Sequence, residues 1–569
     1  MNKQLSIVRL KNTGFSEIYR RFVTNDHISL EELTKIIAIS IILMNQADRV
    51  LQHLGYRIVV GYCNYTKNYL PLYEIALSNG LYPIARFITQ KHIDTDNQNF
   101  FTLWNDAFMQ HFVLENTCLT DEQYEMKRFC DDHNDDDLAF IAPTSYGKSE
   151  LINSIVRQFL NQRVCVITPT KALLSQTKNR LSHSLNTNHP PIVVNGDSIN
   201  QNAPCIAVLT QERLLGLLKK NPSFSFDCII IDEAHELLED NDRSQTLATC
   251  LIILKKRNAG VVFKFLTPFV SDAKNLLPYQ TNITLKSFVV KEYLKAEKYI
   301  IHDMIANKTI MFDQFLKEFW ETEALPKQLD ECDVVISNSL DKNIVYLNKT
   351  TDVVDFANDL SNKLDILSTD SVLHACESIK NYLHPKCNLA VCLSKGILYH
   401  HGSIPDPVRL YIEHIYKTVP EIRYIVTTST LLSGVNIPAK RMFILDNKKG
   451  RSNLNTSAFK NLVGRICRFN EIFDPENGDL CLLEPEIHIV FGKFFAKNSS
   501  YRKFLSSVAI DTELIHDDVS NVLLSNTKID QTIIVDIINE SMYNMRFNGG
   551  CFGGRLWQTK SCILTTSNA

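Results

Sequence analysis

The sequence lacks a strong charge of either sign, a long hydrophobic run and any closely paired cysteines. Its net charge over 569 residues is −3, so no global basic field advertises a nucleic-acid partner, although a channel between domains needs only local positive charge. The N-terminus has no apolar signal core, and the most hydrophobic early run, residues 36–44, is far too short to span a bilayer. We therefore expect a cytoplasmic protein with no membrane partner.

The chain also lacks the patterns typical of metal clusters. Its 15 cysteines include no C-x-x-C pair, and the closest two, Cys387 and Cys392, have no suitably spaced His or Cys beside them. This favours buried free thiols in a reducing compartment over a zinc site. The aspartate-rich stretch 131–137 is interpreted as a solvated loop, with a metal cluster as the alternative.

What the sequence does contain is a candidate phosphate-binding loop. Residues 141–150 read IAPTSYGKSE between a short apolar run and an amphipathic run, which is the order strand, loop, helix. Backbone N–H groups at the positive end of a helix dipole attract polyphosphate. Gly147 permits a close backbone approach, Lys148 would reach the β- and γ-phosphates, and the Ser149 hydroxyl would hold Mg²⁺. Because Ala142 stands where the general pattern has Gly, an ordinary loop is the alternative.

Two carboxylates end a second apolar strand, residues 227–235, which read DCIIIDEAH. Open parallel sheets present catalytic groups at this end of their strands. Asp232 would bind Mg²⁺ through water, and Glu233 would polarise the water that attacks a γ-phosphate. A solvated acidic pair is the alternative, but it leaves Ala234 and His235 unexplained. Loop and strand together predict binding of ATP with Mg²⁺.

The arrangement of apolar segments predicts an α/β protein of several domains. Ser29 and Glu32 have capping-box spacing before a helix, and the helical N-terminal domain is either a docking surface or a structural cap. Strands then alternate with helices twice, which predicts parallel sheets. We expect a helical N-terminal domain at 1–115, an ATP-binding domain at 116–277, a helical connector at 278–340, a second α/β domain at 341–493 and an incomplete, mostly helical accessory region at 494–569.

Across residues 119–493 the chain resembles the superfamily 2 DEAH/DExH-box helicases. The motifs APTSYGKS, TPTKAL, LTQERL and DEAH are followed by HHGSIP, TSTLLSGVNIPAKR and NLVGRICR, collinear in two successive α/β domains. Their order and the GVNIP core are most similar to the superkiller-type (Ski-like) branch, whose members translocate 3′ to 5′ on single-stranded RNA or DNA. The resemblance implies two tandem RecA-like domains with parallel sheets that grip one ATP between them.

The resemblance also assigns roles to residues. It makes Lys148, Glu233, Arg465 and Arg468 catalytic, with the two arginines as arginine fingers toward the γ-phosphate. Without the resemblance, Arg465 and Arg468 are interpreted as a pair of surface arginines near a helix end. It implies an ATP site of Gln123, Ala142, Pro143, Thr144, Ser145, Tyr146, Gly147, Lys148, Ser149, Asp232, His235, Gly434 and Asn436. It implies nucleic-acid contacts by Thr168, Pro169, Thr170, Lys171, Gly196, Thr210, Arg213, His401, Gly402, Thr428, Ser429, Thr430, Lys448, Lys449 and Arg451.

Some features leave alternatives open. Residues 444–457 form either a strand-separating β-hairpin or a basic surface turn. The chain departs from the family pattern at residues 267–269, which read TPF in place of Ser-Ala-Thr, at Asn461, which replaces Gln, and at Ile466 and Cys467, which replace an Ala-Gly pair. These departures bear on the coupling of ATP hydrolysis to unwinding.

Two functions follow from the sequence. The first is an ATP-dependent helicase or translocase acting 3′ to 5′ on single-stranded or partly duplex nucleic acid, with DNA favoured over RNA, as the motor subunit of a bacterial defence or repair system. The second is an ATP-gated nucleic-acid clamp or sensor that controls a partner effector without processive unwinding. A nuclease docking on the helical N-terminal domain is the kind of protein partner we expect.

Overall fold

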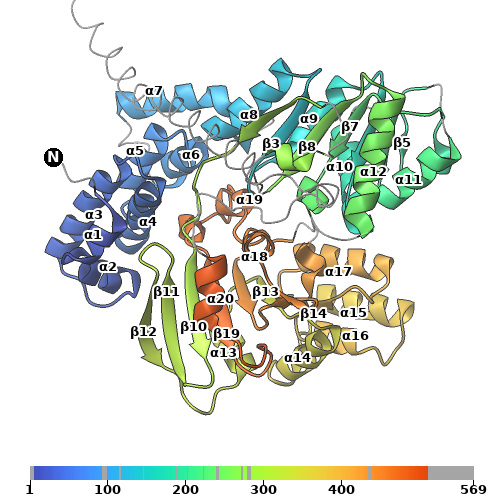
Figure 1. The fold of residues 1–569 in the computed structure, drawn as a ribbon. Coiled ribbons are helices and arrows are strands. Elements are labelled where there is room, and N and C mark those ends of the chain that lie inside the picture. Colours follow the sequence, from blue (N-terminus) through green and yellow to red (C-terminus); the bar gives the residue numbers. More distant parts are fainter. Residues whose placement is uncertain are drawn as a thin grey trace, which may run out of the picture.

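The computed structural model of the protein consists of a helical N-terminal region and two α/β units (Figure 1). It describes residues 5–92, 99–114, 117–144, 146–185, 189–200, 203–221, 223–238, 242–268, 270, 273–277, 283–432 and 437–509. The predictions for Ser145, Phe269, Gly434, Asn436 and most of the C-terminal accessory region lie outside these residues. No helix among the described residues is both long enough and apolar enough to cross a bilayer.

The N-terminal region is helical, as the sequence predicts. The Ser29 hydroxyl accepts the Glu32 N–H and the Glu32 carboxylate accepts the Ser29 N–H, so the expected capping box begins α3. The helices are α1 (Ile7–Lys11), α2 (Phe15–Val23), α3 (Leu30–Met44), α4 (Arg49–Thr66), α5 (Leu70–Ser78), α6 (Tyr82–Lys91) and α7 (Phe100–Met109). A short antiparallel pair, β1 (Val113–Leu114) and β2 (Thr117–Cys118), leads into the first α/β unit.

The first unit is a seven-stranded parallel sheet in the order β5-β6-β4-β7-β8-β3-β9. Its strands are β3 (Asp137–Ile141), β4 (Arg163–Ile167), β5 (Ile192–Val193), β6 (Cys205–Leu209), β7 (Cys228–Ile231), β8 (Val262–Thr267) and β9 (Leu285–Val289). Its helices are α8 (Asp121–Asp132), α9 (Lys148–Gln158), α10 (Lys171–Ser184), α11 (Gln211–Lys220) and α12 (Asp242–Arg257).

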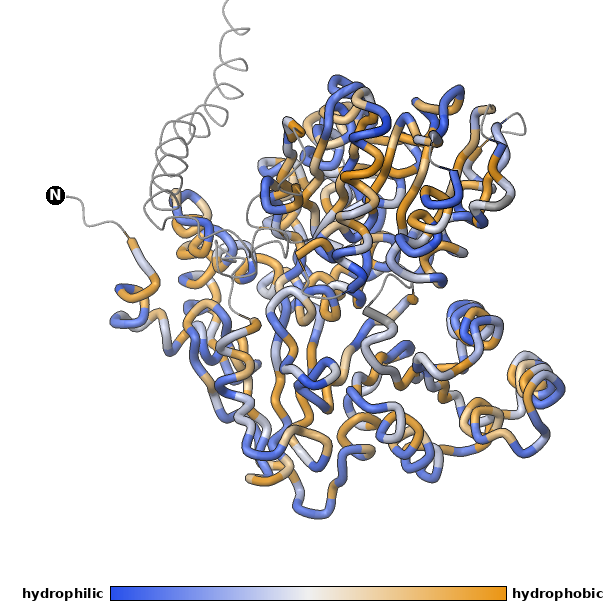
Figure 2. The backbone as a smooth tube through the Cα atoms, turned by 45° about the vertical axis from the view of Figure 1, so that its right-hand side comes forward, coloured by the Kyte–Doolittle hydropathy of each residue, from blue (hydrophilic) through white to orange (hydrophobic). Residues whose placement is uncertain are grey.

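Alternating residues of these strands face opposite sides of the sheet. Leu138 and Phe140 pack in one hydrophobic cluster with residues of α9 and α10. Ala139 and Ile141 pack in a second cluster with residues of α11 and α12. Both faces are therefore buried, as a parallel sheet requires. Figure 2 shows the strands as mostly hydrophobic segments between helices of mixed colour.

The second unit is an eight-stranded sheet in the order β12-β11-β10-β19-β16-β13-β15-β14. It is parallel from β10 to β14, and β11 and β12 add to it antiparallel. The strands are β10 (Lys298–Asp303), β11 (Lys308–Asp313), β12 (Glu318–Ala324), β13 (Asn343–Tyr346), β14 (Ile397–His400), β15 (Tyr424–Thr427), β16 (Arg441–Ile444) and β19 (Glu486–Phe491). The two α/β units confirm the expected tandem RecA-like domains with parallel sheets.

The helices of the second unit come mainly from the connections between its strands. They are α13 (Glu331–Ser337), α14 (Thr350–Asn362), α15 (Asp370–Tyr382), α16 (Asn388–Leu393), α17 (Asp406–Thr418), α18 (Thr456–Val463), α19 (Phe469–Ile472) and α20 (Tyr501–Val508). In Figure 1, α18 and α19 lie between the two sheets.

The expectation of a helical connector at 278–340 is wrong. Strand β9 extends the first sheet, and β10–β12 extend the second, so among residues 283–340, which the structure describes, α13 alone is helical. Two aspartates start the turns between β10, β11 and β12: Asp303 accepts N–H groups two and three residues on, and Asp313 does the same. Asn307 and Lys317 then adopt φ of 53° and 54°. This repeated turn chemistry overrides the helical pattern expected over residues 313–320.

A buried ion pair joins the N-terminal helices to the added strands. Arg57 Nη1 on α4 lies 3.2 Å from Asp313 Oδ2, with side chains 2% and 0% exposed. The Tyr19 hydroxyl on α2 donates to the same oxygen at 2.8 Å. Phe315 and Trp320 pack in one cluster with residues of α1–α4. In Figure 1 these helices lie beside β11 and β12, so the N-terminal region is fixed to the second unit.

We expect Arg57→Met to lower the free energy of unfolding by about 3–5 kcal/mol, because it leaves the Asp313 carboxylate buried without its cation. Chemical denaturation measures the change. Lys35→Met is the matched control, since Lys35 pairs with Glu31 on an exposed face of α3 and such pairs contribute little. Equal unfolding midpoints for the two variants would contradict the assignment.

Candidate active site

The phosphate-loop candidate links β3 to α9 at the carboxyl edge of the first sheet. Gly147, the residue before α9, has φ 79°, a conformation that glycine adopts without strain. The Ala142 N–H donates to the Thr267 carbonyl at 3.0 Å, which ties the start of the loop to the end of β8. Lys148 Nζ turns back and donates to the Ala142 carbonyl at 3.0 Å. The Lys148 ammonium therefore lies against the backbone at the start of its own loop, beside the N-terminus of a helix, where phosphate is attracted.

Lys148 belongs to a buried group of charges. Burial lowers the pKa of its ammonium, and the carboxylates of Glu233 and Asp232 oppose that decrease. Burial raises the pKa of Asp232 to about 6, and the neighbouring Glu233 carboxylate adds to the rise. Burial alone would raise the pKa of Glu233 as well, but Lys148, His235 and Arg465 outweigh it and hold this pKa below its usual value. Of the two carboxylates, Glu233 is therefore the one that ionises at the lower pH.

Glu233 has a constrained backbone. Its φ is 54°, a left-handed conformation that costs a non-glycine residue on the order of 1–3 kcal/mol. Its N–H donates to Asp232 Oδ1 at 3.0 Å, and His235 Nδ1 lies 3.4 Å from its Oε2. The turn after β7 thereby places the Asp232 carboxylate against the Glu233 backbone and His235 beside the Glu233 carboxylate.

The second unit contributes arginines to the same place. Arg465 follows α18 and is 5% exposed. Burial lowers the pKa of its guanidinium, and Glu233 and Asp232 oppose the decrease from the facing unit. Burial also lowers the pKa of Arg468 to about 10, together with repulsion from Arg465. Both arginines thus lie in one electrostatic cluster with Lys148 across the two units.

The two units touch at the loops that carry these charges. A Cβ added to Gly464 would lie 1.8 Å from Thr144 Oγ1 of the phosphate loop. The Tyr146 ring packs edge-on against Phe469 of α19, with centroids 5.2 Å apart. Only a residue without a side chain fits at position 464. Contact between the loops therefore depends on glycine there.

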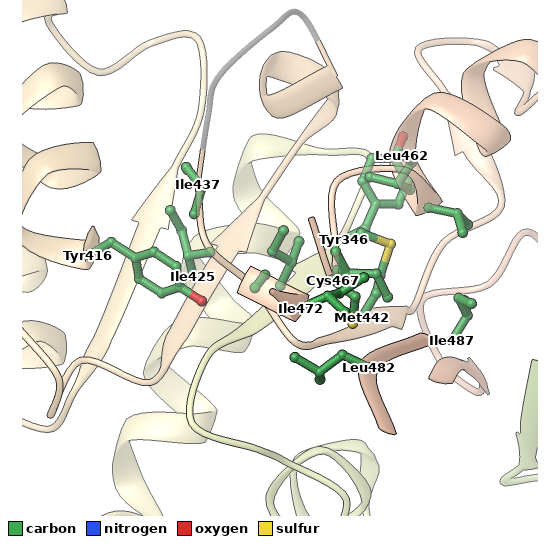
Figure 3. Packing of buried hydrophobic residues seen from close by; sticks show 14 of the residues in the cluster. Tyr346, Tyr416, Ile425, Ile437, Met442, Leu462, Cys467, Ile472, Leu482 and Ile487 are labelled. Carbon is green, nitrogen blue, oxygen red and sulfur yellow. The ribbon is translucent and has the colours of Figure 1, made fainter. Parts of the chain in front are cut away.

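The hydrophobic core of the second unit supports residues 464–468, which carry the two arginines and which we call the arginine segment. Leu462 precedes the two arginines and Cys467 lies between them, and both are buried with Tyr346 and Met442 of the sheet. Figure 3 shows these side chains packed together with Ile472 of α19. The departures from the family pattern fit this packing, since the Cys467 N–H donates to the Ala439 carbonyl at 2.7 Å. The larger residues are part of the core.

Other residues of the expected ATP site lie close by. Gln123 caps α8: its Oε1 accepts the Thr120 N–H at 3.0 Å, and a Cβ on Gly147 would lie 3.8 Å from its Nε2. Its role in reading adenine stays a prediction. Pro143 lies in the same loop, and Ser149 is the second residue of α9. The Ser149 hydroxyl and the Asp232 carboxylate are oxygen donors of the kind that Mg²⁺ prefers, so these residues fit the metal.

A cavity of about 310 Å³ lies between the two units, next to the residues expected to contact nucleic acid. Lys171 Nζ on α10 reaches to 3.9 Å from Asp406 Oδ2 on α17, and Arg213 Nη1 donates to the Val194 carbonyl at 2.7 Å. The cavity is lined by Lys171, Ala172, Leu174, Ser175, Val194, Arg213, Asp406, Arg409, Leu410 and Glu413. It brings together basic and acidic groups of both units.

The remaining candidates for nucleic-acid contact follow the carboxyl ends of parallel strands. His400 Nδ1 lies 3.0 Å from Thr430 Oγ1, which is 3.2 Å from Thr428 Oγ1, so hydroxyls line this edge of the second sheet. After β4, β5, β6, β14 and β15 come Thr168, Pro169, Thr170, Gly196, Thr210, His401, Gly402, Thr428, Ser429 and Thr430. These residues therefore lie at the carboxyl-terminal edges of the two parallel sheets.

The basic segment after β16 is a short hairpin. Strands β17 (Lys448–Lys449) and β18 (Ser452–Asn453) pair antiparallel, with Gly450 at φ 64° in the turn beside Arg451. Asn348 donates to the Gly450 carbonyl and accepts its N–H. The hairpin is present, and its role in separating strands stays a prediction.

Sequence reasoning missed three charged residues of this region. Arg180, near the end of α10, acts electrostatically on both Asp232 and Arg468. Glu292 and Lys295 lie on the segment between β9 and β10, residues 290–297, which we call the strap. No motif marks Arg180. The strap carries its charged residues between β9 and β10. Because a helical connector was expected there, these charged residues were not identified as part of a site.

Comparison with known proteins agrees with this geometry. Residues 123–267 match the family described as DEAD/DEAH box helicase. The chain is 23% identical over 346 residues to Anti-bacteriophage protein B of Escherichia coli (strain K12), covering 58% of this chain and 43% of that protein. It is 23% identical over 356 residues to ATP-dependent DNA helicase Hel308 of Methanocella arvoryzae, covering 57% and 46%. A similarity to Helicase POLQ-like of Drosophila melanogaster is 37% over 108 residues, covering 19% and 9%.

These similarities agree with the fold and the site described above. The fold, the facing charges and the family match together support a superfamily 2 helicase, with a DEAD/DEAH helicase domain at residues 123–267. The chain spans less than half the length of the relatives named above.

We expect Gly464→Ala to lower ATP turnover about tenfold or more, because the new methyl group forces the arginine segment away from Thr144 and small displacements at a reacting centre are costly. Gly216→Ala is the control: Gly216 lies within α11, nothing lies within 4 Å of a Cβ there, and helical Ala is favoured over Gly. Steady-state ATPase assays of both variants provide the measurement. Unchanged turnover in Gly464→Ala would refute the role of this contact.

Proposed function

We propose that the protein is an ATP-dependent helicase or translocase that moves 3′ to 5′ on single-stranded nucleic acid. The observation that carries this proposal is the buried cluster in which Arg465 of the second unit faces Lys148, Asp232 and Glu233 of the first. A site split between two units links the chemistry at the site to the relative motion of the units.

Each residue of the cluster has a task in hydrolysis. The phosphate loop and Lys148 would bind the β- and γ-phosphates, and Ser149 and Asp232 would hold Mg²⁺, which would neutralise phosphate charge. Glu233 would orient the attacking water and accept a proton from it. Arg465 and Arg468 stabilise the charge that spreads over the γ-phosphoryl oxygens in the transition state. Opening and closing of the split site would then move the strand.

The nucleic-acid contacts of the proposal follow the sheet edges. Hydroxyls and helix N-termini bind the sugar-phosphate backbone regardless of sequence, which suits Thr170, Thr428 and Thr430. DNA is favoured as the substrate because Hel308 is named a DNA helicase. A role in bacterial defence is favoured because another relative is named Anti-bacteriophage protein B. The order of the motifs favours the superkiller-type branch.

We expect single-stranded nucleic acid to raise ATP turnover, and Lys148→Ala or Glu233→Gln to abolish it, because the first removes phosphate binding and the second removes the base. The conservative Glu233→Gln should keep nucleotide affinity. Glu377→Gln, an exposed glutamate of α15, is its matched control. Parallel stimulation by single-stranded DNA and RNA decides the substrate. Turnover that persists in either cluster variant would remove this mechanism.

A second candidate function is an ATP-gated clamp that controls a partner effector. Two observations favour it. Thr267, in the altered third motif, is fully buried, and Pro268 and Phe269 carry no hydroxyl, so the hydroxyl pattern of the family is incomplete there. Helix α7 exposes Phe100, Phe101, Trp104 and Phe108 by 49–71%, and apolar patches of this kind mark protein interfaces. A nuclease with a complementary apolar face is the effector we propose for this helix.

A strand-displacement assay separates the two functions. At matched ATPase rates, a helicase releases an annealed strand and a clamp does not. Replacing Phe101 and Trp104 by Asp should leave ATP turnover unchanged and abolish binding of a nuclease co-expressed from the adjacent gene. Retained binding in that variant would exclude α7 as the docking surface.

A further inference from the structure

The strap, residues 290–297, contacts both halves of the split site. The Tyr146 hydroxyl of the phosphate loop donates to Glu292 Oε2 at 3.3 Å, and the Glu122 N–H at the start of α8 donates to Glu292 Oε1 at 3.0 Å. Burial raises the pKa of Glu292 to about 8. Glu122 in turn accepts the Lys291 and Glu292 N–H groups. The first half of the strap is therefore attached to the phosphate loop and to the helix beside it.

The second half of the strap is attached to the arginine segment. Lys295 Nζ donates to the Ile466 carbonyl at 2.8 Å. This carbonyl belongs to the residue between Arg465 and Cys467, so the ammonium fixes the backbone that carries both arginines. Burial lowers the pKa of Lys295, while Cys467 and Glu471 oppose the decrease. A carbonyl and carboxylates are what a buried ammonium needs for its donors.

The backbone beside this carbonyl has an unfavourable conformation. Cys467 has φ 50°, a left-handed conformation that a side chain with a Cβ rarely adopts. Its Sγ donates to the Lys440 carbonyl at 3.2 Å, and the Arg468 N–H at the start of α19 donates to Glu471 Oε2 at 3.3 Å. Lys295 adds a contact from outside the second unit's own motif. Such local strain persists only where the surroundings determine it.

We propose that Lys295 is a positioning residue for the arginines, and that the strap sets their distance from the phosphate loop. The inference rests on the proposed ATP hydrolysis and adds to it a residue that no motif contains. Glu292 and Lys295 lie three residues apart on one segment, so the strap spans from Tyr146 to Ile466. In this proposal Lys295 acts only through the arginine segment.

The test is a double-mutant cycle between Lys295→Met and Arg465→Ala. Methionine matches the volume of lysine and removes its donors. We expect Lys295→Met alone to lower kcat about 10- to 100-fold, the range for losing a charged hydrogen bond in the transition state, with less than a twofold change in KM for ATP. In the Arg465→Ala background it should lower kcat by a clearly smaller factor, because one of the two arginines that it positions is already gone.

Equal factors in both backgrounds, or an unchanged kcat in Lys295→Met, would overturn the proposal. Lys291→Met, an exposed lysine of the same strap, is the matched control and should leave kcat unchanged. Lys295→Arg keeps a charged donor and should retain more activity than Lys295→Met. Equal rates for the two would show that the hydrogen bond to Ile466 is irrelevant.

A second readout does not depend on turnover. In Lys295→Met, affinity for ADP should be unchanged, while affinity for ADP with aluminium fluoride and Mg²⁺, which resembles the transition state, should fall about tenfold or more. Unchanged ADP affinity also shows that the variant is folded. Equal losses for both ligands would identify a structural role only. If wild-type protein binds both ligands but hydrolyses no ATP, the proposed function fails while the positioning of the arginines is still measured.

Discussion

The attraction between Lys148 and Arg465 on one side and Asp232 and Glu233 on the other is the constraint on which the rest of this structure depends. These groups are buried, so the penalty of removing them from water is offset only while opposite charges remain close. Lys148 and the two carboxylates come from the first unit, and Arg465 comes from the second. Gly464 permits the approach, because any side chain there would meet Thr144. The cluster therefore couples the relative position of the units to the ionisation of the groups that perform the chemistry.

The connections around the cluster explain why it can be formed by such distant parts of the chain. The strap carries contacts from the phosphate loop to the arginine segment over eight residues, and the helical N-terminal region is fixed to the second sheet by Arg57 and Asp313. Tyr56 of α4 also donates to the Leu294 carbonyl of the strap at 3.0 Å. An effector on the N-terminal helices would thus have a mechanical path to the site that does not pass through the nucleotide.

The sequence predicted the parts of the fold that have local causes. Gly147 and Lys148 follow a strand and open a helix, and Asp232 ends another strand, so their position at one sheet edge follows from parallel topology. The capping box of Ser29 and Glu32 is also local. What could not be predicted depends on tertiary contacts. The segment with Asp303 and Asp313 has a helical pattern, but its two turns and the partner strand β19 make it a sheet extension. Lys295 stands outside every motif, and only the fold brings it to Ile466.

The added strands also change the rim of the second sheet. Strand β12 forms one edge of this sheet, and most residues of the strand face solvent. An unpaired outer strand offers backbone groups to any other extended chain and so invites aggregation. Glu318, Glu321 and Glu323 place acidic side chains along this strand, and the register shifts between Thr309 and Ile310 of its neighbour. Like charges and an irregular register both discourage intermolecular β-pairing, so the extension that anchors the N-terminal helices also protects the protein from self-association.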